Sequence, residues 1–338
     1  MTGKPSREVF ADSRKVSRFL AKSDPLDILA IELGPRFLEY RRRWDLAKSF
    51  KEIPPFPLHV DYELRRACDL KCPMCLMGEV GPSAAELSPL LAESLIEEGA
   101  AAGQMAMGFG GLWEPLTSPH IPRLVAFGRS KGLLDAMVNT SGLRLSPSLS
   151  SDLIDSGLTR LMISLDAATK ETYALMRPGS DFDKVVENIE ALLAARKKKK
   201  RRLPLVRLSF CLTSLNEKEL APFIERWEGK ADFISVQSYG HFGSGARPLF
   251  PKTSSLPAPS GRCAQPFKRL MVLHDRTVLP CCDLSGLSLK IGSVPESELS
   301  SLWHGPEIKE LRSKLILGGQ ALPPACAKCQ GKYRPAET

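Results

Sequence analysis

Three cysteines stand close together in the stretch CDLKCPMC. Cys68, Cys72 and Cys75 are separated by three and by two residues, so one loop can bring all three thiols to the same point. Structural zinc is nearly always held by four protein ligands, and this stretch offers three. A cubane iron–sulfur cluster also takes four ligands, but with three protein thiolates one of its irons stays open to a small molecule. The spacing therefore predicts a metal centre that binds a small molecule.

The chain has nine cysteines in 338 residues and begins without a secretory signal. Such a chain is a poor candidate for a disulfide framework, so metal or cluster ligation is the leading use of the thiols. The hydrophobic share of 43% and the charged share of 25% are ordinary for a globular protein, and no apolar run approaches the length of a bilayer span. We expect a soluble, cytoplasmic protein that does not use a membrane.

The run RKKKKRR at residues 196–202 carries seven positive charges, against a formal net charge of +9 for the whole chain. Clustered lysine and arginine can release counterions from nucleic-acid phosphate. This run lies between a helical and a strand-like segment and has no interleaved aromatic residue, so we interpret it as a solvated loop and do not expect nucleic-acid binding. Attraction of an acidic electron-donor protein is a further alternative.

From residue 58 onward, short apolar or alternating runs alternate with stretches of helical period. The predicted strands are residues 58–64, 104–110, 134–140, 159–165, 204–210 and 232–238. The predicted helices lie near residues 88–101, 119–131, 148–156, 182–196 and 217–229. Six such repeats with short links predict an α/β fold, a partial (β/α)6 TIM-like barrel whose chemistry gathers at the carboxyl ends of the strands.

Two further regions flank the predicted barrel of residues 58–245. Residues 1–57 read as a mostly helical extension that ends at the breaker IPPFP. Residues 246–338 read as a separate module that begins with a segment rich in Pro, Ser and Gly. This module contains a hairpin pattern in RLMVLHDRTVLP, a helical segment from about residue 297 to 317, and five of the nine cysteines.

The CxxxCxxC pattern directly after the first predicted strand resembles the signature of radical S-adenosylmethionine (SAM) enzymes. The resemblance implies that Cys68, Cys72 and Cys75 hold a [4Fe-4S] cluster whose open iron chelates the amino and carboxylate groups of SAM. It also implies that an electron from this cluster cleaves SAM to a 5′-deoxyadenosyl radical. A flavodoxin- or ferredoxin-type protein is then the expected electron donor.

Motifs at the next strand ends extend the resemblance. FGGLWEPL at residues 109–116 is similar to the family's GGEP motif, with Trp113 where glycine is frequent. VNTSG resembles the third-strand TNG segment with Ser141 at its Asn position, and ISLD with the arginine that follows it resembles the fourth-strand segment. The resemblance implies contacts with SAM for nine residues: Met74, Gly110, Gly111, Glu114, Pro115, Asn139, Ser164, Asp166 and Arg177.

The C-terminal module resembles the SPASM and twitch domains that are appended to such barrels. By that resemblance Cys263, Cys281, Cys326 and Cys329 hold one auxiliary [4Fe-4S] cluster with a complete set of protein ligands, and the fold class is a radical SAM barrel followed by a SPASM/twitch domain. Arg276 stands where a glycine is usual, four residues or so before the second ligand, so the hairpin turn is expected to differ. Cys282 is interpreted as structural, with replacement of Cys281 as ligand the alternative.

Two residues are candidates for catalysis. Cys211 ends the fifth strand, where it is either a buried core cysteine or a hydrogen-atom donor to a substrate radical. His241, at the end of the sixth strand, is a candidate base, and Arg207 is another. A single auxiliary cluster favours oxidation of the substrate by two electrons, whereas a competent Cys211 favours epimerisation.

The substrate class is open on the sequence. Some twitch enzymes that this chain resembles oxidise or epimerise sugar-like molecules, and many SPASM enzymes modify ribosomally made peptides. The N-terminal residues are short and helical compared with a winged-helix leader-binding domain, which favours a carbohydrate-like small molecule. The alternative outside enzymes is a metal-stabilised protein that binds RNA through RKKKKRR.

Overall fold

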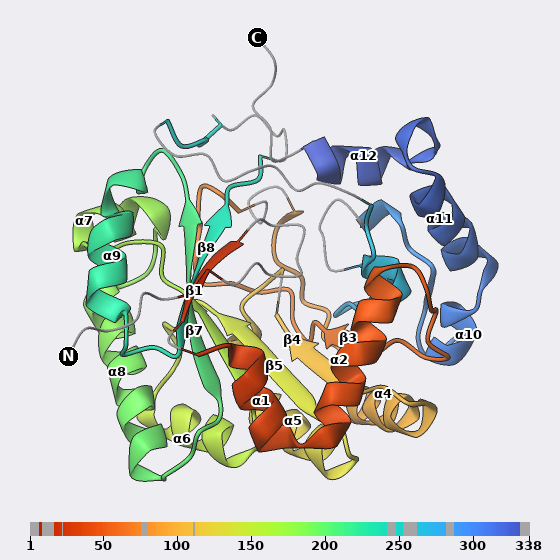
Figure 1. Ribbon diagram of the computed structural model, residues 1–338, viewed down its shortest axis with the longest axis horizontal. Coiled ribbons are helices and arrows are strands. Elements are labelled where there is room, and N and C mark those ends of the chain that lie inside the picture. The colour runs from red at the N-terminus through yellow and green to blue at the C-terminus, as the bar shows by residue number, and fades with distance from the viewer. Residues whose placement is uncertain are drawn as a thin grey trace.

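A parallel sheet forms the centre of the computed structural model, which describes residues 7–8, 17–21, 23–75, 80–110, 112–241, 248–252, 262–281 and 287–331 (Figure 1). All six predicted barrel strands are present and lie side by side in sequence order, each parallel to the next. They are β3 (His59–Tyr62), β4 (Ala106–Phe109), β5 (Asp135–Thr140), β6 (Arg160–Ser164), β7 (Leu205–Leu212) and β8 (Phe233–Ser238). The prediction of a partial barrel with α/β alternation is confirmed.

The crossover helices begin where local capping groups predict. Ser88 accepts a hydrogen bond from the Leu91 N–H (3.2 Å) at the start of one helix, and Asp181 accepts one from the Lys184 N–H (3.2 Å) at the start of another. Proline stands in the first turn of several helices, where its missing N–H leaves no intrahelical hydrogen bond unmade. The helices are α4 (Pro89–Ala102), α5 (Ile121–Ser130), α6 (Pro147–Asp155), α7 (Lys170–Met176), α8 (Phe182–Lys198) and α9 (Leu220–Trp227).

The sheet continues beyond the barrel at both edges, which the sequence did not predict. The N-terminal region contributes β1 (Arg7–Glu8) and β2 (Ser17–Ala21), and β2 pairs antiparallel with β8. The predicted C-terminal hairpin, β9 (Arg269–Val272) and β10 (Thr277–Leu279), is present, and β9 pairs in parallel with β3. With β11 (Gly292–Ser293) the described strands form one eleven-stranded sheet. The auxiliary module is thus built onto the first barrel strand.

The two faces of the sheet differ in polarity. Alternate residues such as Val60, Val138 and Phe210 point outward into the apolar core shared with the crossover helices. The residues between them point to the opposite side, which we call the inner face. Most of its residues from β5 to β8 are only half-buried, so water reaches this face. The half-buried residues of this face are Met137, Asn139, Arg160, Met162, Ser164, Arg207, Cys211 and Gln237.

Two helices cover the amino-terminal end of the inner face. In Figure 1, α1 (Pro25–Leu33) and α2 (Pro35–Lys48) lie in front of the lower part of the sheet, on the side away from α5 and α6. Phe37, Tyr40 and Trp44 of α2 pack against strand residues that include Ala106 and Leu205. The Lys268 ammonium lies 4.1 Å from the centre of the Trp44 ring. Because α1 and α2 cover this end of the inner face, we expect the reaction at the carboxyl ends of the strands.

The C-terminal helices clamp the chain segment that leads into the barrel. The predicted helix of residues 297–317 is two helices, α10 (Leu299–Trp303) and α11 (Pro306–Leu317), because Gly305–Pro306 starts a new first turn. The Trp303 indole N–H donates to the Pro54 carbonyl (2.7 Å), and the Arg312 guanidinium lies 4.0 Å from the Trp303 ring centre. A last helix, α12 (Pro324–Gly331), follows.

The basic run is partly helix, so its prediction as a loop is wrong in part. Helix α8 continues through Lys198, and Arg196 pairs with Asp232 while donating to the Pro204 carbonyl (2.6 Å). Lys199 pairs with Asp155 (2.5 Å). Because β7 begins at Leu205, the run lies at the amino-terminal end of the sheet, opposite the cysteine loop. None of the described helices combines the length and the apolarity needed to cross a membrane.

We predict that Trp44→Ala lowers the free energy of unfolding by about 3–5 kcal/mol, because it removes a large buried side chain from the layer that covers the inner face. Ile31→Ala is the control, because this side chain on the neighbouring helix is 80% exposed and its loss is worth about 0.5 kcal/mol or less. Denaturant titration followed by circular dichroism measures both. Equal midpoints for the two variants would show that α2 does not stabilise the fold.

Candidate active site at the carboxyl ends of the strands

The cysteine loop follows β3 and is braced from two sides. Cys68 and Cys72 are half-buried and Cys75 is exposed. The Cys75 N–H donates to the Cys72 carbonyl (3.0 Å), which forms a tight turn that includes the predicted SAM contact Met74. Asp69 accepts two hydrogen bonds of 2.6 Å from Arg144, on the segment after β5. The loop therefore has a fixed path between the strand ends.

A glycine lets a second segment come close to this loop. Gly179 has φ of 93°, and a Cβ there would lie 3.0 Å from the Asp69 carbonyl oxygen. The neighbouring Lys71 N–H donates to the Pro178 carbonyl (3.1 Å). This approach sets the place of Arg177, which comes just before. Pro178 and Gly179 form a Pro-Gly pair, a local turn signal in the sequence that could have marked this approach.

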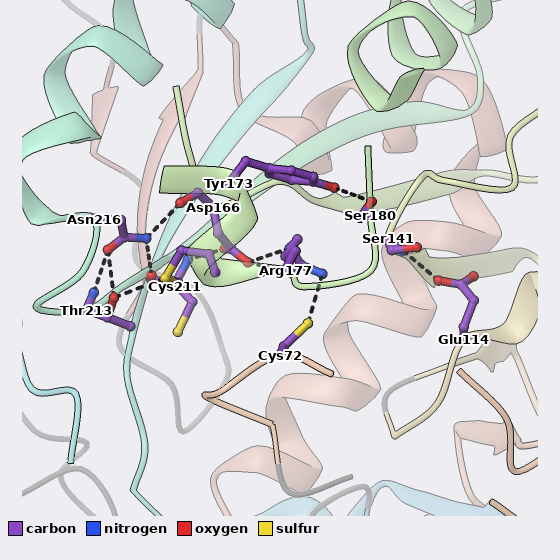
Figure 2. Close-up of polar contacts among 11 residues, drawn as sticks. Cys72, Glu114, Ser141, Asp166, Tyr173, Arg177, Ser180, Cys211, Thr213 and Asn216 are labelled. Atoms are coloured by element: carbon purple, nitrogen blue, oxygen red, sulfur yellow. Dashed lines mark hydrogen bonds and ion pairs between the residues drawn. The ribbon is translucent and has the colours of Figure 1, made fainter. Parts of the chain in front are cut away.

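Asp166 and Arg177 form a buried ion pair beside Cys72. The Arg177 Nε donates to Asp166 Oδ2 (2.9 Å), and its Nη2 contacts the same oxygen. Its Nη1 lies 4.0 Å from the Cys72 sulfur (Figure 2). Burial opposes the charge, but Asp166 and Cys72 raise the pKa of Arg177 above its ordinary value, so the guanidinium stays charged. Two predicted residues are thereby brought to the cysteine loop.

The same carboxylate also holds the end of β7. The other oxygen of Asp166 accepts a hydrogen bond of 2.6 Å from the Cys211 N–H. Asn216 spans the same two residues, donating to the Asp166 carbonyl (2.8 Å) and to the Cys211 carbonyl (2.9 Å) (Figure 2). Phe210 and Leu212 point into the outer core, so Cys211 lies on the inner face. The role of Asn216 was not predictable from the sequence, because no local motif indicates that its amide contacts the residue after another strand.

Glu114 is held by three protein donors. Its carboxylate accepts hydrogen bonds from the Leu116 N–H (3.1 Å), the Thr140 hydroxyl (2.7 Å) and the Ser141 N–H (2.7 Å). The side chain is 4% exposed. The acidic residue of the GGEP-like motif thus ties the end of β4 to the end of β5. A contact of Glu114 with SAM stays a prediction, and its carboxylate already has partners in the protein.

The remaining predicted SAM contacts gather at the same strand ends. Gly110 has φ of 101°, and a Cβ there would lie 2.6 Å from the Asn139 carbonyl oxygen and 3.2 Å from Pro115. Only glycine therefore allows β4 to pass so close to β5. Asn139 and Ser164 are half-buried on the inner face. Gly111 lies outside the described residues. These residues share one location, and their contacts with SAM stay predictions.

The candidate bases are placed differently. His241 Nδ1 lies 3.0 Å from the Tyr239 hydroxyl, and both rings pack with Phe250. Arg207 lies on the inner face, where burial and the charge of Arg160 lower its pKa to about 10. At neutral pH its guanidinium is therefore protonated and cannot accept a proton. This protonation state disfavours Arg207 as a base, and the assignment of the base stays a prediction.

The second set of cysteines lies in the C-terminal module. Cys263 and Cys326 belong to one small apolar cluster with Phe267 and Leu311. Cys329 is buried three residues further on in α12, and Cys281 is half-buried just after β10. Cys282 lies outside the described residues. These positions support a shared centre but do not test the ligand set.

Arg276 has a left-handed backbone conformation. Its φ of 71° is in the left-handed region that glycine enters freely. The turn between β9 and β10 therefore contains a left-handed non-glycine residue, and a difference from the turn of related domains stays a prediction. The cost is backbone strain of about 1 kcal/mol in a non-glycine residue.

The donor chemistry of both sets fits iron–sulfur clusters. Each set is made of thiols, and the first has three on one loop. Burial raises the pKa of Cys72 to about 11, against the opposing effect of Arg177. In the part of the chain that the structure describes, no three His, Cys, Asp or Glu side chains converge on a single-ion site.

A fold of this kind, with three cysteines after its first barrel strand, is typical of enzymes that use an iron–sulfur cluster and SAM. A family model of the radical SAM superfamily matches residues 62–226, and a model of the SPASM iron–sulfur cluster-binding domain matches residues 263–330. The chain therefore belongs to the radical SAM superfamily and carries a SPASM domain. Its cofactors are SAM and two [4Fe-4S] clusters.

Individual relatives share limited sequence identity with this chain. The AdoMet-dependent heme synthase of Methanosarcina barkeri (strain Fusaro / DSM 804) is 32% identical over 142 residues, which are 41% of this chain and 40% of that protein. The mycofactocin maturase MftC of Mycobacterium ulcerans (strain Agy99) is 29% identical over 150 residues, 44% of this chain and 40% of that protein. The matched part thus spans well under half of either relative.

Among solved structures, Streptococcus suis SuiB bound to its precursor peptide SuiA is similar to this chain. The TM-score is 0.62 at 14% sequence identity, and the match covers 82% of this chain and 71% of SuiB. At this identity the likeness shows a common fold.

We predict that Asp166→Asn lowers the free energy of unfolding by about 3 kcal/mol, because it leaves the buried Arg177 guanidinium without its counter-ion. Asn tolerates the positive φ of 60° at this position, so the backbone is not the cause of the loss. Asp69→Asn is the control at a partly exposed ion pair and is expected to cost less than about 1 kcal/mol. Denaturant titration compares the two, and equal losses would contradict the special place of Asp166.

Proposed function

We propose that this chain removes a hydrogen atom from a substrate held at the inner face and that Cys211 returns one, so that the enzyme epimerises its substrate. The thiyl radical that this leaves on Cys211 is reduced back to the thiol by one electron from a flavodoxin- or ferredoxin-type donor and one proton from solvent. The observation that carries the proposal is the line of contacts from Cys72 through Arg177 and Asp166 to Cys211. It places a thiol on the inner face next to the cysteine loop. When bound, the first cluster and SAM supply a 5′-deoxyadenosyl radical that abstracts the hydrogen atom.

The residues of the chain hold the cofactor and keep it oriented. Cys68, Cys72 and Cys75 are the proposed ligands of the first cluster. Arg177 directs Nη1 toward Cys72 while its other nitrogens are held by Asp166, so a cation is fixed beside the site where the SAM carboxylate is expected. Glu114 joins the ends of β4 and β5. Its role is to keep the SAM-binding segments in register.

A second candidate reaction is two-electron oxidation of the substrate. It is supported by the four cysteines of the SPASM domain, three of which are buried. With all four as ligands, the auxiliary cluster has no open iron and is suited to electron transfer. In this reaction the substrate radical loses a proton and gives its electron to the auxiliary cluster, and Cys211 has no part.

The substrate is proposed to be polar. The inner face presents amide, hydroxyl and guanidinium groups at Asn139, Ser164 and Arg207, with sulfur atoms between them. Such a surface suits a carbohydrate-like molecule or a polar segment of a peptide. Likeness to the maturase MftC, and to SuiB with its bound precursor peptide, supports the peptide. A flavodoxin- or ferredoxin-type donor is proposed to reduce the first cluster.

We predict that the anaerobically reconstituted chain contains about eight irons, since each of the two clusters holds four. It forms 5′-deoxyadenosine when dithionite is added, and Cys72→Ala abolishes this product because the first cluster loses a ligand. Cys326→Ala, in the second set, is expected to retain about four irons and the cleavage of SAM. Iron analysis and chromatography measure these results, and a chain that binds only zinc and leaves SAM intact would contradict the proposal.

We predict that, without substrate and in deuterated water, the wild-type enzyme forms 5′-deoxyadenosine that carries one deuterium. The exchangeable thiol hydrogen of Cys211 becomes deuterium in this solvent, and transfer to the 5′-carbon leaves a thiyl radical. Cys211→Ala is expected to give unlabelled product at a similar iron content, as read by mass spectrometry. Equal labelling in the two proteins would favour the oxidation reaction over epimerisation.

A further inference from the structure

The inner face of β7 presents three residues in one column. Leu208, Phe210 and Leu212 point outward into the core, so the residues that alternate with them point inward. These inward residues are Arg207, Ser209 and Cys211. A strand rises about 3.3 Å per residue, so Arg207 lies about 13 Å below Cys211 along the strand. The column therefore leads from the carboxyl end of the sheet into its interior.

Arg207 has no counter-ion among the described residues. No ion pair or hydrogen bond joins its guanidinium to another described group, and its Nε is buried without a partner. Ser209, two residues nearer to Cys211, is 4% exposed, and its hydroxyl also lacks a partner. Buried polar groups are nearly always hydrogen-bonded in native proteins. Two such groups on one inward column point to a ligand.

The charged neighbours of Arg207 are already paired. Arg160, on the adjacent strand, donates to Asp135 from Nε (3.1 Å) and through a second contact. Asp135 is fully buried and also accepts a hydrogen bond from the Thr159 hydroxyl (2.5 Å). The positive charge of Arg160 therefore repels that of Arg207, and the Asp135 carboxylate is already bound by Arg160 and Thr159. One positive charge, that of Arg207, remains without a partner in this group.

The Asp61 carboxylate, on the same face, is occupied as well. It accepts from Arg269 Nη1 (3.1 Å) and lies 2.9 Å from His59 Nε2. Asp61 is thus ion-paired with Arg269 on β9. Arg207 is half-buried and its Nε is fully shielded from water. An unpaired cation in such a place is unfavourable, because its partial loss of hydration is not offset by an opposite charge. A ligand that brings one negative charge removes this penalty.

We propose that Arg207 and Ser209 bind a carboxylate of the substrate. This assignment rests on the proposed function, since it takes the inner face as the substrate site. A carboxylate carries the single charge that Arg207 lacks and matches the planar guanidinium in a bidentate pair. A phosphate dianion would leave a surplus negative charge. The separation from Cys211 requires several bonds between the carboxylate and the reacting carbon of the substrate.

Saturation-transfer-difference NMR on the full chain with reconstituted clusters tests this site, with propionate as the probe. Wild-type protein and Arg201→Gln, a control at an exposed arginine outside the sheet, are expected to saturate propionate equally. Arg207→Gln is expected to lose this transfer, and neutral propionamide is expected to show none. Equal transfer to propionate in Arg207→Gln would overturn the proposal.

Competition experiments distinguish a carboxylate from a phosphate, and a peptide carboxylate from that of a small molecule. Phosphate at matched ionic strength is expected to leave the propionate signal unchanged, and displacement by phosphate would overturn the assignment to a carboxylate. N-acetyl-glutamate N-methylamide represents an acidic residue within a peptide. If it displaces propionate, the carboxylate belongs to a peptide side chain; if only propionate and other small acids bind, it belongs to a small molecule. Either result supports the carboxylate site.

Thermal unfolding gives a second readout that does not depend on binding. Because Arg207 has no partner among the residues that the structure describes, Arg207→Gln is expected to keep or raise the melting temperature, by up to about 3 °C. A fall of that size would show a structural partner and overturn the proposal. Neither measurement needs SAM cleavage. Failure of 5′-deoxyadenosine formation would therefore remove the proposed function, whereas failure of propionate binding in an enzyme that cleaves SAM removes only this inference.

Discussion

The buried carboxylate of Asp166 is the constraint on which the rest of the site depends. One of its oxygens holds Arg177 next to Cys72, and the other accepts the Cys211 N–H. A single side chain therefore sets the distance between the cysteine loop and the inner face of β7. It can do so because Asp166 follows β6 in a left-handed conformation, with φ of 60°, which turns the chain away from the strand direction.

The parallel sheet explains why these residues meet at one end. Every crossover helix returns the chain to the same edge, so the carboxyl ends of β3 to β8 lie together. Helices α1 and α2 cover the opposite end of the inner face with an apolar layer built around Trp44. A substrate at the inner face would consequently approach from the end that carries the cysteines. The pairing of β9 with β3 fixes the SPASM domain to the same sheet.

Local patterns made the barrel predictable. Apolar alternation located all six barrel strands to within about two residues, and N-terminal serine and aspartate with early proline marked the helix starts. The extension of the sheet by β2 and β9 was not predictable, because it pairs segments about 200 residues apart in sequence. The ion pairs of the basic run were not predictable either, because their partners Asp232 and Asp155 come from distant parts of the chain.

For the site, the sequence by itself determined which chemical groups are available: thiols at cluster spacing, an SxD segment with a following arginine, and a cysteine after the fifth strand. Only the tertiary structure decided how they are used. The Glu114 carboxylate accepts hydrogen bonds from three protein donors, and Asn216 joins two strand ends. Arg207 lies on the inner face with no counter-ion in the described part of the chain. The physical reason is that spacing and residue type are local properties, whereas the partner of a buried charge comes from whichever distant segment the fold places beside it.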